Sequence, residues 1–134
     1  VYSVRSCHAT NSLPTDTSVF DQMRCIVGER YKLIYNLLPG QPWVPIDFAG
    51  TEMFAELKRM HRSGELDALS SRLYFSPTRP MFELYDLRND PCEQRNLIDD
   101  PALKEIRNDL ILKLTYKMIE DEDFVTLPHP KIYE

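Results

Sequence analysis

The stretch from Phe82 to Leu97 constrains the fold more than any other part of this 134-residue sequence. Its first residues, Phe82-Glu83-Leu84-Tyr85, have the aromatic and branched character of a half-buried strand. Asn89-Asp90-Pro91 is typical of a turn, because Asn and Asp bond their own backbone and Pro fixes φ. Asp99-Asp100-Pro101 then predicts a helix start with an Asp cap. The stretch is therefore predicted to be a structural joint, without a nucleophile, metal ligand or phosphate site.

One long helix is predicted after this joint. Its apolar residues recur at steps of three and four, which places them on one face. About eighteen to twenty residues at roughly 1.5 Å each would cover a small sheet. The acidic run 120–123 lies where the helix dipole disfavours negative charge, so we expect the helix to end near it. The apolar stripe consists of Leu103, Ile106, Leu110, Leu114 and Met118.

Three strands and a helix are predicted before the joint. Residues 1–6 alternate as a half-buried strand does. Residues 20–27 and 31–38 form a hairpin around Gly28, which can take a positive φ. Residues 51–69 predict a helix that Thr51 caps and Gly64 ends or interrupts, with a second short turn at Leu66 and Leu69.

The composition excludes some classes of function. The net charge is −5, which argues against nucleic acid as a partner because phosphate binding needs a basic patch. No stretch approaches the roughly 20 apolar residues of a membrane span. The three cysteines form no CxxC pair, so zinc and a disulfide scaffold are poorly supported and buried free thiols are expected.

The joint also resembles a known family. Residues 83–87, with Asp90-Pro91, Glu93 and Asn96-Leu97, are similar to the ELYDL-x-x-DP-x-E-x-x-NL signature near the C-terminus of sulfatases. Their order and spacing most resemble the sulfamidases (heparan N-sulfatases, or N-sulfoglucosamine sulfohydrolases). Further matching segments are Val1 to Ser6, Met23-Arg24 and Tyr31 to Leu37, with weaker support from Pro45-Ile46-Asp47 and Ser76-Pro77.

The resemblance implies a particular chemistry. Sulfatases make a formylglycine nucleophile from the first residue of a C/S-x-P-x-R motif, and a divalent cation, normally calcium, holds the sulfate oxygens. Neither Cys7, Cys25 nor Cys92 begins such a motif. We therefore assign no catalytic and no metal-binding residue here, and expect formylglycine and calcium in an alkaline-phosphatase-like catalytic domain upstream that is missing from this sequence.

The predicted fold is α+β, a small antiparallel sheet of about four strands with the long C-terminal helix packed across one face. The resemblance divides the chain into residues 1–18, the end of a catalytic-domain strand with a pocket-side loop, and residues 19–134, the sulfatase C-terminal subdomain. In an alternative arrangement, residues 1–6 belong to the large sheet of the catalytic domain and form an orphan edge here.

His8 is the one candidate substrate-contacting residue. In the sulfamidase-like pattern its position lies in a His-rich stretch followed by an acid, whereas this chain has Cys7-His8-Ala9. An ordinary exposed or hydrogen-bonded histidine is the alternative. Arg24 is expected to form a structural salt bridge or a carbonyl clamp, with a pocket role as its alternative. Trp43 is expected to be a packing anchor, with stacking on a sugar as its alternative.

The predicted function follows from the resemblance. The full-length form would hydrolyse sulfate from sulfated glycosaminoglycan sugars, with its own N-terminal catalytic domain and the glycan as partners. This part would buttress that domain and form one wall of the pocket. By resemblance, such an enzyme is periplasmic or secreted in bacteria, or lysosomal in animals. The alternative is a free-standing glycan-binding or protein-interaction module, which the absence of an aromatic platform disfavours.

Overall fold

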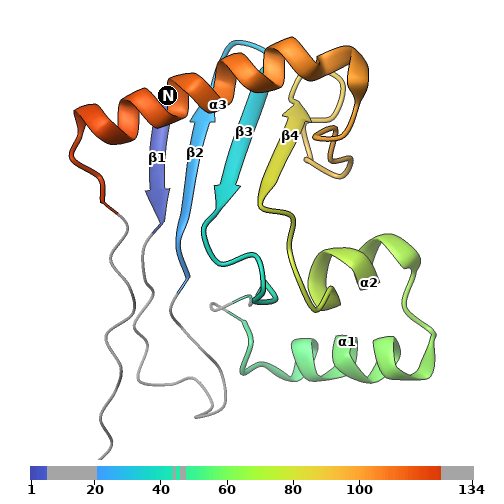
Figure 1. Cartoon of the computed structure of the whole chain (residues 1–134). Coiled ribbons are helices and arrows are strands. Elements are labelled where there is room, and N and C mark those ends of the chain that lie inside the picture. The colour runs from blue at the N-terminus through green and yellow to red at the C-terminus, as the bar shows by residue number, and fades with distance from the viewer. Residues whose placement is uncertain (6–20, 44, 46–47, 125–134) are drawn as a thin grey trace, which may run out of the picture.

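The computed structural model describes residues 1–5, 21–43, 45 and 48–124. A four-stranded sheet carries a long helix across one face, and two shorter helices lie beyond one end of the sheet (Figure 1). The predicted α+β fold is confirmed. The elements in order are β1 (Tyr2–Arg5), β2 (Met23–Val27), β3 (Tyr31–Asn36), α1 (Glu52–Ser63), α2 (Ala68–Phe75), β4 (Phe82–Asp86), the 3-10 turn η1 (Pro101–Leu103) and α3 (Lys104–Glu120).

The described sheet is antiparallel throughout, in the order β1-β2-β3-β4. Ile26 pairs with Leu33, and Leu33 pairs with Leu84, so these apolar side chains share a face. The hairpin of β2 and β3 is confirmed. Gly28 does not adopt the positive φ that a glycine can take; among the described glycines, Gly64 has a φ in that region.

Residues 2–5 join this sheet as its outer strand β1, with Tyr2 opposite Ile26 and Ser3 opposite Cys25. The alternative of an orphan edge is wrong for residues 2–5, because they pair with β2, whereas their membership in a larger sheet of the catalytic domain stays a prediction. The division into residues 1–18 and 19–134 also stays a prediction, because residues 6–20 lie outside the described part of the chain.

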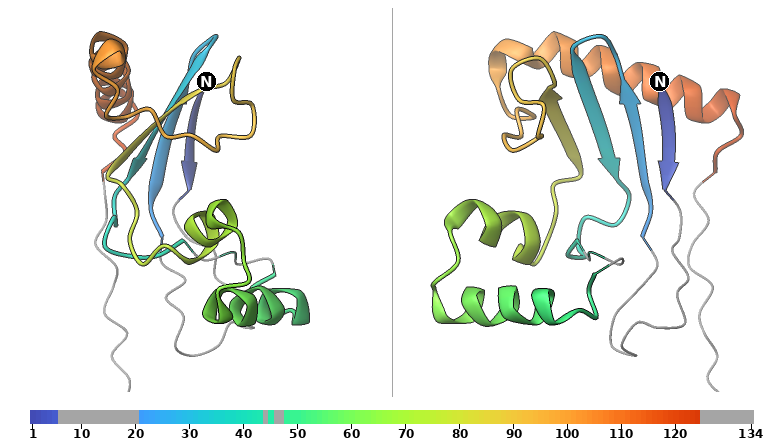
Figure 2. Two further views of the ribbon diagram at one scale, coloured as in Figure 1. Left: turned by 90° about the vertical axis from the view of Figure 1, so that its right-hand side faces the viewer. Right: turned by 180° about the vertical axis from the view of Figure 1, so that it is seen from behind.

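The core lies between the sheet and α3. Leu33 and Leu84 of the sheet meet Leu110 and Leu114 of the helix, and all four side chains are buried. The remaining members of the predicted stripe are partly buried against them, so the predicted helix face is confirmed. Figure 2 shows α3 on one side of the sheet and the two shorter helices toward the other. The partly buried residues of the predicted helix stripe are Leu103, Ile106 and Met118.

The signature residues form the predicted joint. The Asp86 carboxylate accepts hydrogen bonds from Asn89 Nδ2 at 2.8 Å and from the Arg88 amide at 3.2 Å. Asn96 Oδ1 accepts from the Leu84 amide at 2.9 Å, and the Leu97 amide donates to the Leu84 carbonyl at 2.8 Å. The chain after β4 is therefore fastened back along the free edge of that strand before α3 begins.

A buried ion pair ties the end of α3 to the sheet. Arg24 of β2 donates to Asp123 through Nε at 2.5 Å and Nη2 at 2.7 Å, and the Tyr2 hydroxyl donates to the same carboxylate. We call Tyr2, Arg24 and Asp123 the Asp123 clamp. Hydrogen bonding from Arg24 lowers the pKa of Asp123, and burial raises the pKa of Tyr2 to about 12. The structural salt bridge predicted for Arg24 is confirmed.

Two helices occupy the segment between β3 and β4. Thr51 Oγ1 accepts from the Phe54 amide at 3.3 Å, and Gly64 ends α1 with a φ of 74°, so both predicted ends of this helix are correct. The short turn expected after Gly64 was wrong in extent, because Asp67 caps a full helix, α2. The segment closes on itself where the Asn36 amide donates to the Met81 carbonyl at 2.8 Å.

Candidate functional site

The face of the sheet turned away from α3 carries a hollow of about 570 Å³. Ile34, Glu83 and Tyr85 form part of its floor, because they alternate with the core residues along β3 and β4. Residues 72–74 of α2 and the loop 93–96 form walls. This volume falls within the range of roughly 300–1,000 Å³ that is usual for ligand sites. We call it the sheet hollow.

Hydrogen bonds connect Glu83 and Tyr85 of the floor to the buried Asn36. Asn36 Nδ2 donates to Glu83 Oε1 at 2.5 Å and to the Pro80 carbonyl at 2.8 Å. The Tyr85 hydroxyl donates to the other oxygen of Glu83. Burial and this hydrogen bond raise the pKa of Tyr85 well above its ordinary value. Tyr85 is therefore a fixed donor at neutral pH, and Glu83 is an acceptor whose two oxygens are already engaged.

Two of the charged residues that line the sheet hollow, Glu93 and Arg79, are neutralised by ion pairs. Lys32 Nζ lies 2.7 Å from Glu93 Oε2, and Arg79 Nη2 lies 2.7 Å from Asp21 Oδ1. Arg72 donates to the Gln94 carbonyl through Nη2 at 2.7 Å.

Arg95 is a cation of this wall that remains available. Its side chain is exposed, and no described residue forms an ion pair with it. Arg72 also keeps unused donors, since the bond to Gln94 takes one of its nitrogens. The two guanidinium groups can therefore bind an anion, and Arg geometry suits the flat pair of oxygens of a carboxylate or sulfate.

Trp43 and Tyr74 supply the aromatic part of the lining. Their ring centroids lie 5.8 Å apart at an interplanar angle of 53°, and Phe48 also packs on Tyr74. Trp43 is half-buried and lines the hollow. It therefore serves as the packing anchor that we expected, and one part of it still faces the hollow.

The described residues contain no cluster of metal-ligating side chains. No group of three His, Cys, Asp or Glu side chains in this part of the chain can hold a metal ion. His61 is exposed and stacks on Phe75 at 4.6 Å. Cys25 is half-buried, whereas Cys92 is exposed, so the expectation of buried thiols was wrong for Cys92.

Several predicted positions lie outside the described residues. His8, the candidate sugar contact, is one of them, and so is Cys7. Their roles stay predictions. None of the described helices is long and apolar enough to cross a membrane.

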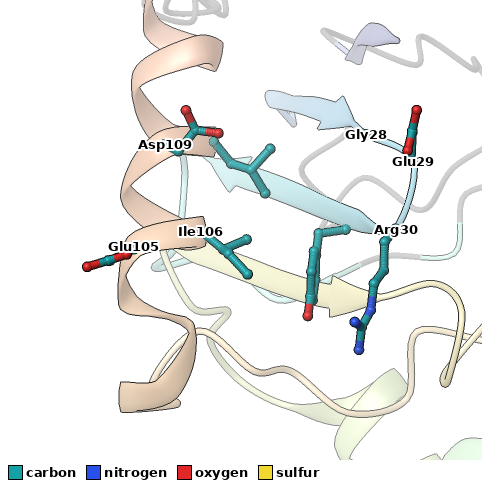
Figure 3. Close-up of a pocket in the computed structure, with 8 residues that line it drawn as sticks. Gly28, Glu29, Arg30, Glu105, Ile106 and Asp109 are labelled. Atoms are coloured by element: carbon teal, nitrogen blue, oxygen red, sulfur yellow. The ribbon is translucent and has the colours of Figure 1, made fainter.

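A second, shallower hollow of about 370 Å³ lies between the β2–β3 turn and α3 (Figure 3). Ile106 and Leu110 give it an apolar floor. Two of its four charged residues are paired with residues outside it, since Arg30 binds Asp86 at 2.6 Å and Asp109 binds Lys113 at 2.7 Å. Because no polar groups converge in it, the sheet hollow is the stronger candidate for binding.

The comparisons with known proteins give one match and one absence. Over 101 residues, the chain is 33% identical to a protein of Formosa agariphila named Ulvan-active sulfatase. The match covers 71% of this chain and 17% of that protein, so the chain spans about a sixth of the relative. No protein-family model matches the chain. The similarity makes this chain a homologue of one segment of a sulfatase, and does not distinguish sulfamidases from other sulfatases.

Proposed function

We propose that this chain is the C-terminal part of a sulfatase whose full-length form hydrolyses sulfate from sulfated glycosaminoglycan sugars, as N-sulfoglucosamine sulfohydrolase does. The 33% identity to a sulfatase is the observation that carries the proposal. The signature residues support it, because Asp86, Asn96 and Leu97 have defined structural roles in the joint.

In this proposal the reacting groups belong to the rest of the enzyme. Formylglycine and calcium lie in the catalytic domain, because this sequence contains no C/S-x-P-x-R motif. The present chain buttresses that domain and forms one wall of the substrate pocket. Residues 1–18 end a strand of the catalytic domain and form a pocket-side loop, in which His8 donates to a sugar hydroxyl or a sulfate oxygen.

The sheet hollow has the chemistry that a wall for an anionic sugar needs. Trp43 and Tyr74 offer ring faces for the apolar side of a sugar. Arg72 and Arg95 offer donors to a sulfate or carboxylate group. We therefore propose the sheet hollow as the part of the described chain that contacts the glycan.

Sulfate release by the full-length enzyme tests the activity. The substrates are an N-sulfated glucosamine, an aryl sulfate and ulvan, each with and without calcium. Ulvan is included because the relative is named for it. We expect turnover by the full-length protein and none by the isolated chain. Turnover by the isolated chain that survives repurification would place the nucleophile here and refute the proposed division of labour.

Arg95→Ala tests the proposed sugar contact, with Arg88→Ala as the matched control. Both side chains are exposed, but Arg88 does not line the sheet hollow. In the full-length enzyme we expect Arg95→Ala to lower kcat/KM for the glycan about tenfold, which corresponds to roughly 1.4 kcal/mol. Turnover of the aryl sulfate should be unchanged. An equal fall for both substrates would exclude a specific sugar contact.

A second candidate is a free-standing glycan-binding module, which the aromatic and Arg lining of the sheet hollow favours. In that case the isolated chain binds the sulfated glycan by itself, and Arg95→Ala weakens this binding. Calorimetric titration of the isolated chain decides. If the folded chain does not bind the glycan, the free-standing module is excluded, and the C-terminal part of a sulfatase remains the proposal.

A further inference from the structure

The outer face of α3 carries an apolar stripe that the core does not use. Leu112, Tyr116 and Ile119 are spaced by four and three residues, so they lie within about 60° of one another around the helix axis. The core residues Leu110 and Leu114 lie on the opposite side of the same helix. The three outer side chains are 53%, 64% and 64% exposed.

This stripe occupies only the second half of α3. On the same side of the first half, the helix carries Glu105 and Asp109, which are exposed. Phe124, which is 77% exposed, follows soon after the C-terminal end. An apolar patch of this kind with a polar rim marks a contact surface, since a helix lying on a small sheet has no need of apolar residues on its outer side.

The free edge of the sheet lies on the same flank. Within the described strands, β1 pairs with β2 alone, so one edge of β1 has no strand partner. Val4 of this strand is 46% exposed. Figures 1 and 2 both place the C-terminal end of α3 at this edge, and the bond from Tyr2 to Asp123 joins the two. We call β1 and the outer stripe with Phe124 the β1 flank.

We infer that the β1 flank is the surface that the catalytic portion of the full-length sulfatase covers. Its backbone would pair with the free edge of β1, and its apolar side chains would pack on Tyr116 and Ile119. The inference rests on the proposed function and names the surface through which the chain meets its own catalytic domain. The relative supports it, because about five-sixths of that sulfatase lies outside the matched segment.

A second copy of the chain fits this flank less well. A stable dimer buries about 800 Å² on each partner. The flank offers one four-residue strand and four outer side chains. Each aromatic side chain among them can bury roughly 150–250 Å² of surface. A tethered domain needs less area, because the link raises its effective concentration to about millimolar. A contact within one chain is therefore favoured over a dimer.

Thiol labelling of the full-length enzyme tests the inference. Ile119→Cys places a thiol in the stripe, and Glu105→Cys places one on the polar half of the same helix side. Maleimide labelling is followed at the peptide level by mass spectrometry, so the native cysteines do not interfere. We expect the thiol at position 119 to react at least about tenfold more slowly than the thiol at position 105. Equal rates in the folded enzyme would overturn the inference.

Two further arms identify the occupant. Protection that appears only as the protein concentration rises would assign the flank to a second copy and overturn the inference. A variant that ends at Phe124 should keep the protection. Loss of the protection in this variant would assign the covering role to residues 125–134 and overturn the inference.

Hydrogen exchange of the unmodified enzyme supplies a measurement that needs no substitution. If another segment pairs with β1, all backbone amides of β1 should exchange slowly. If the β1 amides that point away from β2 exchange at unprotected rates, the inference is wrong. Sulfate release is measured on the same samples. An active enzyme with an accessible flank contradicts this inference alone, whereas a protected flank without sulfate release contradicts the proposed function alone.

Discussion

Replacing Asp123 by Asn should strongly destabilise this chain, because it removes the charge partner of a buried guanidinium. The Arg24 side chain is 3% exposed and the Asp123 side chain 15%, so water cannot replace the lost carboxylate. Breaking one side of a buried ion pair costs about 3–5 kcal/mol. The Tyr2 hydroxyl loses its carboxylate acceptor as well. We therefore expect Asp123→Asn to lower the free energy of unfolding by about 3–5 kcal/mol.

Urea unfolding followed by circular dichroism measures this change, with Asp109→Asn as the control. Asp109 also pairs with a cation at 2.7 Å, but both side chains of its pair with Lys113 are more than half exposed. An exposed pair at this helical spacing contributes only about 0.3–0.5 kcal/mol. The same chemical change should therefore have unequal effects at the two positions. Similar losses for both variants would refute the reasoning.

A double-mutant cycle separates the ion pair from general packing. Arg24→Met removes the charge and keeps most of the apolar volume, so the double variant with Asp123→Asn leaves no unpaired buried charge. It should be less destabilised than the sum of the two single variants. Strict additivity would mean that the two side chains do not interact energetically, whatever their distance.

The remaining predictions concern pH, the core and the substrate. Folding lowers the pKa of Asp123, so the stabilisation from the Asp123 clamp should be complete above the ordinary carboxyl pKa of about 4 and be lost as the pH falls below it. The urea midpoints of the wild-type chain and of Asp123→Asn should therefore converge at low pH. Leu110→Ala should destabilise by about 2–5 kcal/mol and Lys113→Ala by no more than roughly 0.5 kcal/mol; equal urea midpoints would contradict the burial of that face. In the full-length enzyme, His8→Ala should lower kcat/KM for the glycan more than for an aryl sulfate, and an equal change in both would exclude a sugar contact.

Local patterns predicted most of the sheet and its long helix. The alternation along residues 31–36 and the joint after β4 are properties of neighbouring residues, so one sequence is enough to find them. The Asp cap at position 100 is equally local, since Asp100 accepts from the Ala102 amide at 2.9 Å. The acidic run after residue 119 correctly indicated the end of α3, which is Glu120.

Helix α2 was missed because its sequence has a weak helical pattern. Ser70 and Ser71 are poor helix formers, and the apolar residues that follow are consecutive and not spaced by three or four. Two contacts favour the helix nonetheless. Asp67 accepts from the Ser70 amide at 2.9 Å, and Phe75 stacks on Phe54 of α1 at 5.7 Å. The second contact depends on tertiary structure, which a local pattern does not contain.

The sheet hollow and the β1 flank were missed for a related reason. The residues of the hollow come from β2, β3, β4, α2 and three loops, so no spacing along the chain brings them together. The structural role of Arg24 was predicted, but its partner Asp123 lies 99 residues away. The outer stripe of α3 does have helical spacing. It was overlooked because the stronger inner stripe already explained the helix.

The segment between β3 and β4 leaves the frame formed by the sheet and α3, and it returns to this frame at the place where it left. Its ends are fastened where the Asn36 amide meets the Met81 carbonyl, and where the Arg79 amide donates to the Pro39 carbonyl at 2.8 Å. Loop-closure entropy rises by only about 0.6 kcal/mol for each doubling of loop length. Insertions and replacements in this segment should therefore leave the sheet and α3 nearly unchanged. Because Trp43 and Arg72 of the sheet hollow both belong to this segment, natural or engineered exchange of it can alter ligand preference without redesigning the frame.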